Sequence, residues 1–235
     1  MARFTLRQGR LMTSGPVRVS MLLLVLLACD DSSTTPVIAG SGAFVQVYNT
    51  ARGAGDLAVR IDNVTVRSHL AFGATTDSLS VSPGNHLVAL VPSAAGRSAG
   101  SATVTFRPGH LTTLVALESL TVLIPQPLTD TGLEVPPGKS RLRVAHLAAQ
   151  APPIAIFRIQ PDYPDPVNVM FPFEYGAVSS YIPSTPGDWW VIVTDSTPGD
   201  TLVKEGPIGI PEGQERTVVI VDGDSAGLQT LILDP

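Results

Sequence analysis

The sequence repeats itself after about 100 residues, and this repetition constrains the fold more than any other feature. The stretch PGNHLVALV at 83–91 resembles PGDWWVIV at 186–193, and TLVAL at 113–117 resembles TVVIV at 217–221. The motif Phe-Gly-Ala at 72–74 returns as Tyr-Gly-Ala at 175–177. We therefore expect two copies of one domain, the second carrying about six extra residues at 161–166.

Each copy is patterned as a series of short β-strands. Apolar residues alternate with polar or small ones around Val45, Val59 and Val144, as in half-buried strands. Gly and Pro, at 21 residues each, punctuate the chain with turns. The pattern predicts an all-β protein of two tandem β-sandwich domains, residues 43–124 and 140–235. The Pro-rich segment 125–139 is predicted as the linker between them.

Residues 1–28 have the pattern of an export signal peptide. Their only charged residues are four arginines, and an apolar run at 21–28 follows. That run is far shorter than the ~20 residues that an ordinary membrane-spanning helix needs. The segment LLAC at 26–29 is similar to a bacterial lipobox, which predicts lipid attachment at Cys29 and a polar tether over 29–42. The alternative is an ordinary secretory peptide that leaves a free thiol.

The charge distribution argues against nucleic-acid binding. The chain has a formal net charge of -5, and all 20 acidic residues follow the signal segment. Its only lysines are Lys139 and Lys204, so clustered cations that could bind a phosphate backbone are missing from the sequence. Cys29 is the only cysteine, which excludes a disulfide within the chain.

The opening of the second copy resembles a bacterial domain-of-unknown-function family numbered 4397. RVAH at 143–146 followed by APPIAI at 151–156 is similar to the opening motif of that family. The Phe-Gly and Pro-Gly pairs of both copies are similar to its later motifs. Asn49 and Ala155 depart from the pattern, replacing a His and an Asp. The resemblance implies immunoglobulin-like sandwiches on secreted or anchored proteins, with no assigned activity.

Three groups of residues are candidates for chemistry, and each has a simpler structural interpretation. Ser225 in GDSAG at 223–227 fits a hydrolase motif, but strand-like segments on both sides favour a hairpin turn. The acidic pairs Asp222/Asp224 and Asp162/Asp165 lack the spacing of a calcium loop. The histidines are scattered without ligand spacing, at His69, His86, His110 and His146. We expect no enzyme activity, no metal and no cofactor.

The adjacent tryptophans Trp189 and Trp190 are the most informative candidates for binding. Neighbouring strand residues point to opposite faces, and the family pattern turns Trp189, Val191 and Val193 inward. Trp190 then faces outward, where it either contacts a partner or is covered by the insert or the other copy.

The sequence as a whole predicts a non-catalytic, lipid-anchored protein of the bacterial cell envelope. Its expected contacts are the membrane, through the lipid on Cys29, and an envelope protein or a glycan. The alternatives are a carbohydrate-contacting module that uses Trp190 with Tyr163, a hydrolase at Ser225, or a spacer.

Overall fold

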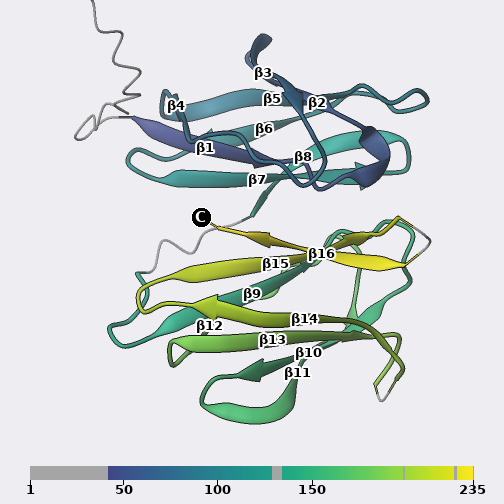
Figure 1. Ribbon diagram of the computed structural model, residues 1–235. Coiled ribbons are helices and arrows are strands. Elements are labelled where there is room, and N and C mark those ends of the chain that lie inside the picture. The colour runs from purple at the N-terminus through teal and green to yellow at the C-terminus, as the bar shows by residue number, and fades with distance from the viewer. Residues whose placement is uncertain (1–41, 129–133, 198, 225–226, 235) are drawn as a thin grey trace, which may run out of the picture. The chain divides into compact units, whose positions relative to one another are not determined.

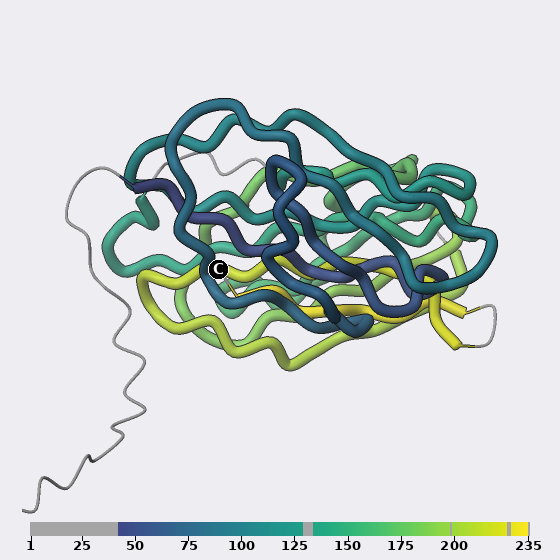
Figure 2. Tube along the Cα trace, turned by 90° about the horizontal axis from the view of Figure 1, so that it is seen from above, coloured from purple at the N-terminus to yellow at the C-terminus, as the bar shows by residue number. Residues whose placement is uncertain are grey.

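The computed structural model describes residues 42–128, 134–197, 199–224 and 227–234, and these residues form an all-β protein, as predicted. Four sheets of four strands account for the regular structure, with one short 3-10 helix, η1 (Arg52–Ala54) (Figure 1). The chain passes from strand to strand through short turns, which can be followed along the trace in Figure 2.

The first eight strands form two sheets, which we call the N-terminal sheet pair. Their orders are β4-β1-β7-β8 and β3-β2-β5-β6, and only β1 and β7 run parallel. The strands are β1 (Ala43–Tyr48), β2 (Leu57–Ile61), β3 (Val64–Leu70), β4 (Leu79–Val81), β5 (Gly84–Pro92), β6 (Gly100–Phe106), β7 (Leu111–Ser119) and β8 (Val122–Leu128).

The last eight strands form the C-terminal sheet pair, in the same order. The sheets are β12-β9-β15-β16 and β11-β10-β13-β14, and here β9 runs parallel to β15. The strands are β9 (Ser140–His146), β10 (Ile154–Gln160), β11 (Tyr163–Phe173), β12 (Ile182–Ser184), β13 (Gly187–Thr194), β14 (Thr201–Ile210), β15 (Glu215–Asp222) and β16 (Leu228–Leu233).

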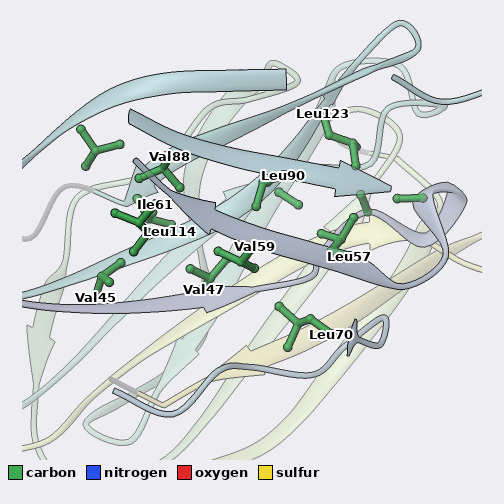
Figure 3. Packing of buried hydrophobic residues seen from close by; sticks show 14 of the residues in the cluster. Val45, Val47, Leu57, Val59, Ile61, Leu70, Val88, Leu90, Leu114 and Leu123 are labelled. Atoms are coloured by element: carbon green, nitrogen blue, oxygen red, sulfur yellow. The ribbon is translucent and has the colours of Figure 1, made fainter. Parts of the chain in front are cut away.

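Each sheet pair encloses its own apolar core, which makes it a β-sandwich. In the N-terminal pair, Val45 and Val47 of β1 lie beside Leu57 and Val59 of β2, and all four side chains are fully buried (Figure 3). In the C-terminal pair, Trp189 is the largest fully buried side chain. Because successive strand residues alternate between faces, every second residue of these strands enters a core.

A buried polar side chain ends the first strand of each pair in the same way. The Asn49 side chain accepts a hydrogen bond from Ala51 N, and His146 Nδ1 accepts one from Ala148 N. The Asn49 carbonyl also accepts the N–H of Gly73, and the His146 carbonyl accepts that of Gly176. Asn49 and His146 therefore make the same two contacts in their sheet pairs, and the Asn49 amide in addition donates to the carbonyls of Gly55 and Leu70 (both 2.9 Å).

The two sheet pairs share a third apolar cluster. Val115 of β7 and Leu128 of β8 pack with Val219 and Val221 of β15 in this cluster, together with Tyr48, Ala145, Leu147 and Leu233. The Tyr48 hydroxyl donates to the carbonyl of Asp234 (2.6 Å), and Arg52 donates to the carbonyl of Asp222 (3.0 Å). Strand β15 consequently has both faces buried, one in its own core and one in this shared cluster.

The linker predicted at 125–139 begins too early. Strand β8 continues to Leu128, with Pro125 paired to Ala116 and Pro127 paired to Leu114 of β7. Proline cannot donate a backbone hydrogen bond and is tolerated in a strand at the edge of a sheet, which is where β8 lies. The two prolines therefore mark an edge strand, and a Pro-rich composition alone could not separate these possibilities.

One side of the N-terminal sandwich is closed where β6 meets β8 at Gly100. Ser98 N donates to the carbonyl of Thr121 (2.8 Å), and Leu123 N donates to the carbonyl of Ser98 (3.2 Å). A Cβ atom on Gly100 would lie only 1.9 Å from the Leu123 carbonyl oxygen. The absence of a side chain at this position is what allows the two strands to approach.

We predict that Gly100→Ala destabilises the protein by about 1–3 kcal/mol, the usual cost of overpacking, because the added methyl must displace backbone. Urea unfolding measures the change. Gly209→Ala is a control for the loss of a strand glycine, since the backbone of Gly209 is not left-handed and its Cβ position has only an Asp188 carboxylate oxygen within 4 Å, at 3.8 Å. Equal stability of Gly100→Ala and the wild type would contradict the close approach of β6 and β8.

We also predict that His146 makes the protein less stable in acid. Burial lowers the pKa of His146 below its ordinary value of 6.5, so below that pH the unfolded chain binds a proton that the folded chain resists. Stability therefore falls as the pH drops from 7 toward 5. His146→Asn, which copies the residue at Asn49, should lose less stability over this range in urea titrations. Parallel pH profiles for the variant and the wild type would refute this role.

Candidate functional site

Strand β13 carries the two tryptophans, and its residues alternate between the core and the outer face of the sheet. Trp189, Val191 and Val193 are fully buried in the C-terminal core, as predicted. Trp190 and Ile192 are half-buried and lie on the opposite face, away from that core. Trp189 also donates a hydrogen bond from Nε1 to the Ser140 hydroxyl (3.4 Å), which accommodates its one polar atom.

The strand register gathers apolar residues around Trp190. Ile159 of β10 lies directly opposite Trp190, and Phe157 of β10 lies opposite Ile192. On the other side of β13, Lys204 of β14 lies opposite Ile192. Directly paired residues share a face of a sheet, so these side chains lie together on the outer side. We call this surface the Trp190 face, defined by Phe157, Ile159, Trp190, Ile192 and Lys204.

The indole of Trp190 is held flat against strand β14. The Lys204 ammonium lies 4.8 Å from the centre of the ring, a cation–π contact. A Cβ atom on Gly206 would lie only 2.6 Å from the ring, so the glycine leaves the space that the indole occupies. Trp190 is therefore fixed in place, and ordering it on binding costs little conformational entropy.

The equivalent face of the N-terminal sheet pair has a different character. The row Phe157, Ile192 and Lys204 across β10, β13 and β14 corresponds to the row Arg60, Ala89 and Ser101 across β2, β5 and β6. Arg60 and Ser101 are exposed, and neither presents an apolar surface. The position of Trp190 itself is held by Leu87, an exposed aliphatic residue, so the N-terminal face has no aromatic ring where the C-terminal face has Phe157 and Trp190.

The structure does not bring Tyr163 to the Trp190 face. Tyr163 begins β11 and is half exposed, and its partner in the ladder is Gln160, next to the Ile159 that faces Trp190. Adjacent strand residues point to opposite faces, so the register directs the two aromatic side chains away from each other. In the turn before Tyr163, Asp162 accepts hydrogen bonds from the Ser184 hydroxyl and from Thr185 N.

The turn at 160–163 is thus fastened to the neighbouring sheet, since Ser184 belongs to β12. The hydroxyl of Ser184 lowers the pKa of the Asp162 carboxyl, which favours its ionised, hydrogen-bonding form. This is a structural use for part of the predicted insert.

The other acidic candidates are also occupied by internal hydrogen bonds. The Asp222 carboxylate accepts the N–H groups of Ala149 (3.0 Å) and Gln150 (3.1 Å), and Asp224 pairs with Arg52. Among the described residues, no group of three or more His, Cys, Asp or Glu side chains could hold a metal ion. Cys29 and Ser225 lie outside the described residues.

A pocket of about 390 Å³ lies at one end of the C-terminal sheet pair. It is bordered by Pro152, Asp195, Leu202, Asp222 and Leu228. Its two carboxylates already accept internal hydrogen bonds, since Asp195 accepts the N–H of Asp200 (2.9 Å) and Asp222 accepts N–H groups of the loop after β9.

No helix in the described part of the chain is both long and apolar enough to cross a membrane.

Sequence reasoning placed Trp190 on the outer face but missed its neighbours. Phe157 and Ile159 were not predicted to belong to a site, although the run IAIFRI at 154–159 is almost continuously apolar. A strand with apolar residues at both odd and even positions has an apolar outer face as well as an inner one. That signal could have identified β10 as part of this surface.

Comparison with known families supports the predicted resemblance over part of the chain. Residues 43–157, from the start of β1 into β10, match the family model described as "Domain of unknown function (DUF4397)". No curated protein sequence matches the chain.

Similarity to solved structures is weak. The chain is 9% identical to the tip fimbrial protein Mfa3 from Porphyromonas gingivalis, with a TM-score of 0.29, covering 83% of this chain and 100% of that one. It is 12% identical to a leucine-rich repeat protein from Bacteroides thetaiotaomicron, with a TM-score of 0.22, covering 75% of this chain and 26% of that one. It is 11% identical to the Bacillus anthracis TIE protein, with a TM-score of 0.24, covering 77% of this chain and 34% of that one. The chain thus spans about a quarter to a third of the length of the last two proteins.

Proposed function

We propose that this chain is a lipid-anchored protein of the bacterial cell envelope that binds a partner protein and is held at the membrane through Cys29. Its two sheet pairs are tandem copies of one immunoglobulin-like sandwich, and the Trp190 face of the second copy contacts the partner. The identical strand order of the two pairs supports the tandem arrangement. The matching hydrogen bonds at Asn49 and His146 support it independently.

The observation that carries the binding role is the aromatic character of the Trp190 face. Phe157, Ile159, Trp190 and Ile192 lie together on the outer side of the sheet, whereas the corresponding N-terminal positions hold Arg60, Leu87 and Ala89, which include no aromatic ring. Rigid aromatic side chains surrounded by apolar neighbours are typical of the residues that contribute most to protein–protein binding. The fixed position of Trp190 under Lys204 adds to this, because a preordered contact residue loses little freedom on binding.

A protein partner fits this surface better than a glycan does. The carbohydrate alternative requires Trp190 and Tyr163 to form one aromatic platform, but the strand register directs them to opposite faces of the sheet. The turn that carries Asp162 is, moreover, already bound to Ser184 and Thr185.

We predict that Trp190→Ala abolishes capture of a specific partner from envelope extract by immobilised residues 30–235, because it removes the central contact of the Trp190 face. Quantitative mass spectrometry of the captured proteins measures the effect. Leu87→Ala is the matched control, because Leu87 is the exposed residue at the corresponding position of β5. Thermal unfolding verifies that both variants fold.

Three outcomes count against this proposal. A partner captured equally by Trp190→Ala would place the binding surface elsewhere. Capture of a glycan that requires both Trp190 and Tyr163 would favour the carbohydrate alternative. Recovery of no partner by the folded wild type would favour a spacer role.

The membrane anchor is tested separately. We predict that cells expressing the full chain incorporate labelled palmitate into it and that Cys29→Ser abolishes the incorporation, since Cys29 is the only thiol. Triton X-114 partitioning gives a second readout, with the wild type in the detergent phase and the variant in the aqueous phase. An unlabelled wild type that partitions into water would indicate an ordinary secretory signal.

A further inference from the structure

Three side chains at one end of the N-terminal sheet pair form a hydrogen-bonded series. The hydroxyl of Ser82 lies 3.1 Å from Nε2 of His86, and Nδ1 of His86 lies 2.6 Å from a carboxylate oxygen of Asp62. The series connects a hydroxyl, an imidazole through both of its nitrogens, and a carboxylate. This is the order of groups that activates a serine nucleophile in hydrolases on several unrelated folds.

The fold holds the carboxylate in place through two bonds to a single residue. Asp62 N donates to the carbonyl of Leu87 (2.9 Å), and Leu87 N donates to the second carboxylate oxygen of Asp62 (3.0 Å). Asp62 and Asn63 form the tight turn between β2 and β3, with φ values of 50° and 66°. Left-handed backbone at two consecutive residues other than glycine is uncommon and fixes the turn in one conformation.

The imidazole is held as firmly, while the hydroxyl is accessible. The His86 ring packs on Phe106 with centroids 5.5 Å apart, and its side chain is only 13% exposed. Ser82 is exposed in the turn between β4 and β5. Because Ser82 is exposed to solvent, a small ester in solution has access to it.

We propose that Ser82 is an activated nucleophile that attacks small esters, with His86 as the general base and Asp62 as a positioning residue. In the first step the Ser82 oxygen bonds to the ester carbonyl carbon while its proton passes to Nε2 of His86. The bond from that carbon to the alcohol oxygen then breaks, and the alcohol leaves with the proton from Nε2. Water cleaves the acyl-serine by the same route, which yields the acid and regenerates Ser82.

The charge of the carboxylate suits its role. The hydrogen bond from His86 lowers the pKa of Asp62, so this carboxyl is ionised at neutral pH and accepts the proton on Nδ1. With Nδ1 protonated, Nε2 of the neutral imidazole is free to accept the proton of Ser82. Asp62 thus selects the tautomer that the reaction needs.

The second sheet pair provides an internal comparison. The residues that correspond to Ser82 and His86 there are Thr185 and Trp189. Trp189 is fully buried and has no basic nitrogen, and Asp162 accepts a hydrogen bond from Thr185 N. The series is therefore confined to the N-terminal pair. The series belongs to a different sheet pair from the Trp190 face, and the reaction it supports differs from the expectation of a chain without enzymatic activity.

Fluorophosphonate labelling of the purified full chain tests the proposal, with the labelled peptide identified by mass spectrometry. We predict a single labelled residue, Ser82, and no labelling of Ser82→Ala. His86→Phe keeps an aromatic ring on Phe106 but lacks the base, and it should slow labelling about a hundredfold. Ser80→Ala, which alters an exposed serine of neighbouring β4, should label like the wild type. Release of nitrophenol from p-nitrophenyl acetate should follow the same ranking.

The role of Asp62 has its own readout. In the wild type, the Nδ1 proton of His86 should give a far-downfield proton resonance because it is hydrogen-bonded to a carboxylate. Asp62→Asn should remove this resonance and slow labelling, while thermal unfolding verifies that the variant folds. A folded wild type in which Ser82 reacts no faster than Ser80, or a folded His86→Phe that labels at the wild-type rate, would overturn the proposal.

Discussion

The parallel pairing of the first and seventh strands of each sheet pair is the interaction on which the rest of the structure depends. Strand β1 lies between β4 and β7, and β9 lies between β12 and β15. The first strand of each sheet pair thus contacts a strand about seventy residues further along the chain. Closing so long a loop costs conformational entropy, and burial of the strand offsets this cost. The buried side chains of Asn49 and His146 end these strands by satisfying nearby backbone groups, so the chain turns toward the second sheet at a fixed point.

Within each sheet pair, the two sheets differ in how much of their surface is buried. Val218 and Ile220 of β15 enter the C-terminal core, whereas Val219 and Val221 enter the cluster shared with the N-terminal pair. A strand buried on both faces needs an almost continuous apolar run, which is what residues 217–221 provide. The sheets that contain β2 and β10 have one face in a core and the other outside it. Differences in surface chemistry between the two sheet pairs can therefore arise on those outer faces without disturbing either core.

The alternation of apolar residues was sufficient to predict the all-β class, and together with the family resemblance it predicted the burial of Trp189, Val191 and Val193. It could not predict features that depend on pairing between distant strands. The Trp190 face requires the register of β10 against β13, and the Ser82–His86–Asp62 series requires two turns to meet across β5. The linker prediction failed at Pro125 and Pro127 because composition does not reveal whether a proline lies at the edge of a sheet. Strand register and edge position depend on pairing between strands that are distant in the sequence, so a local residue pattern cannot predict them.

Corresponding residues of the two sheet pairs show which contacts both pairs share and which belong to one pair alone. Asn49 and His146 differ in chemistry but accept the same bond from the residue two positions later, while Asn49 in addition donates to the carbonyls of Gly55 and Leu70. His86 and Trp189 hold the same position on β5 and β13, where Trp189 lies in the core and His86 packs on the buried ring of Phe106. The imidazole also contacts Ser82 and Asp62 through its two nitrogens, whereas the indole has a single N–H, which it donates to Ser140. A residue that satisfies the packing and still offers a second chemistry is where two sheet pairs of the same strand order can differ in function without loss of stability.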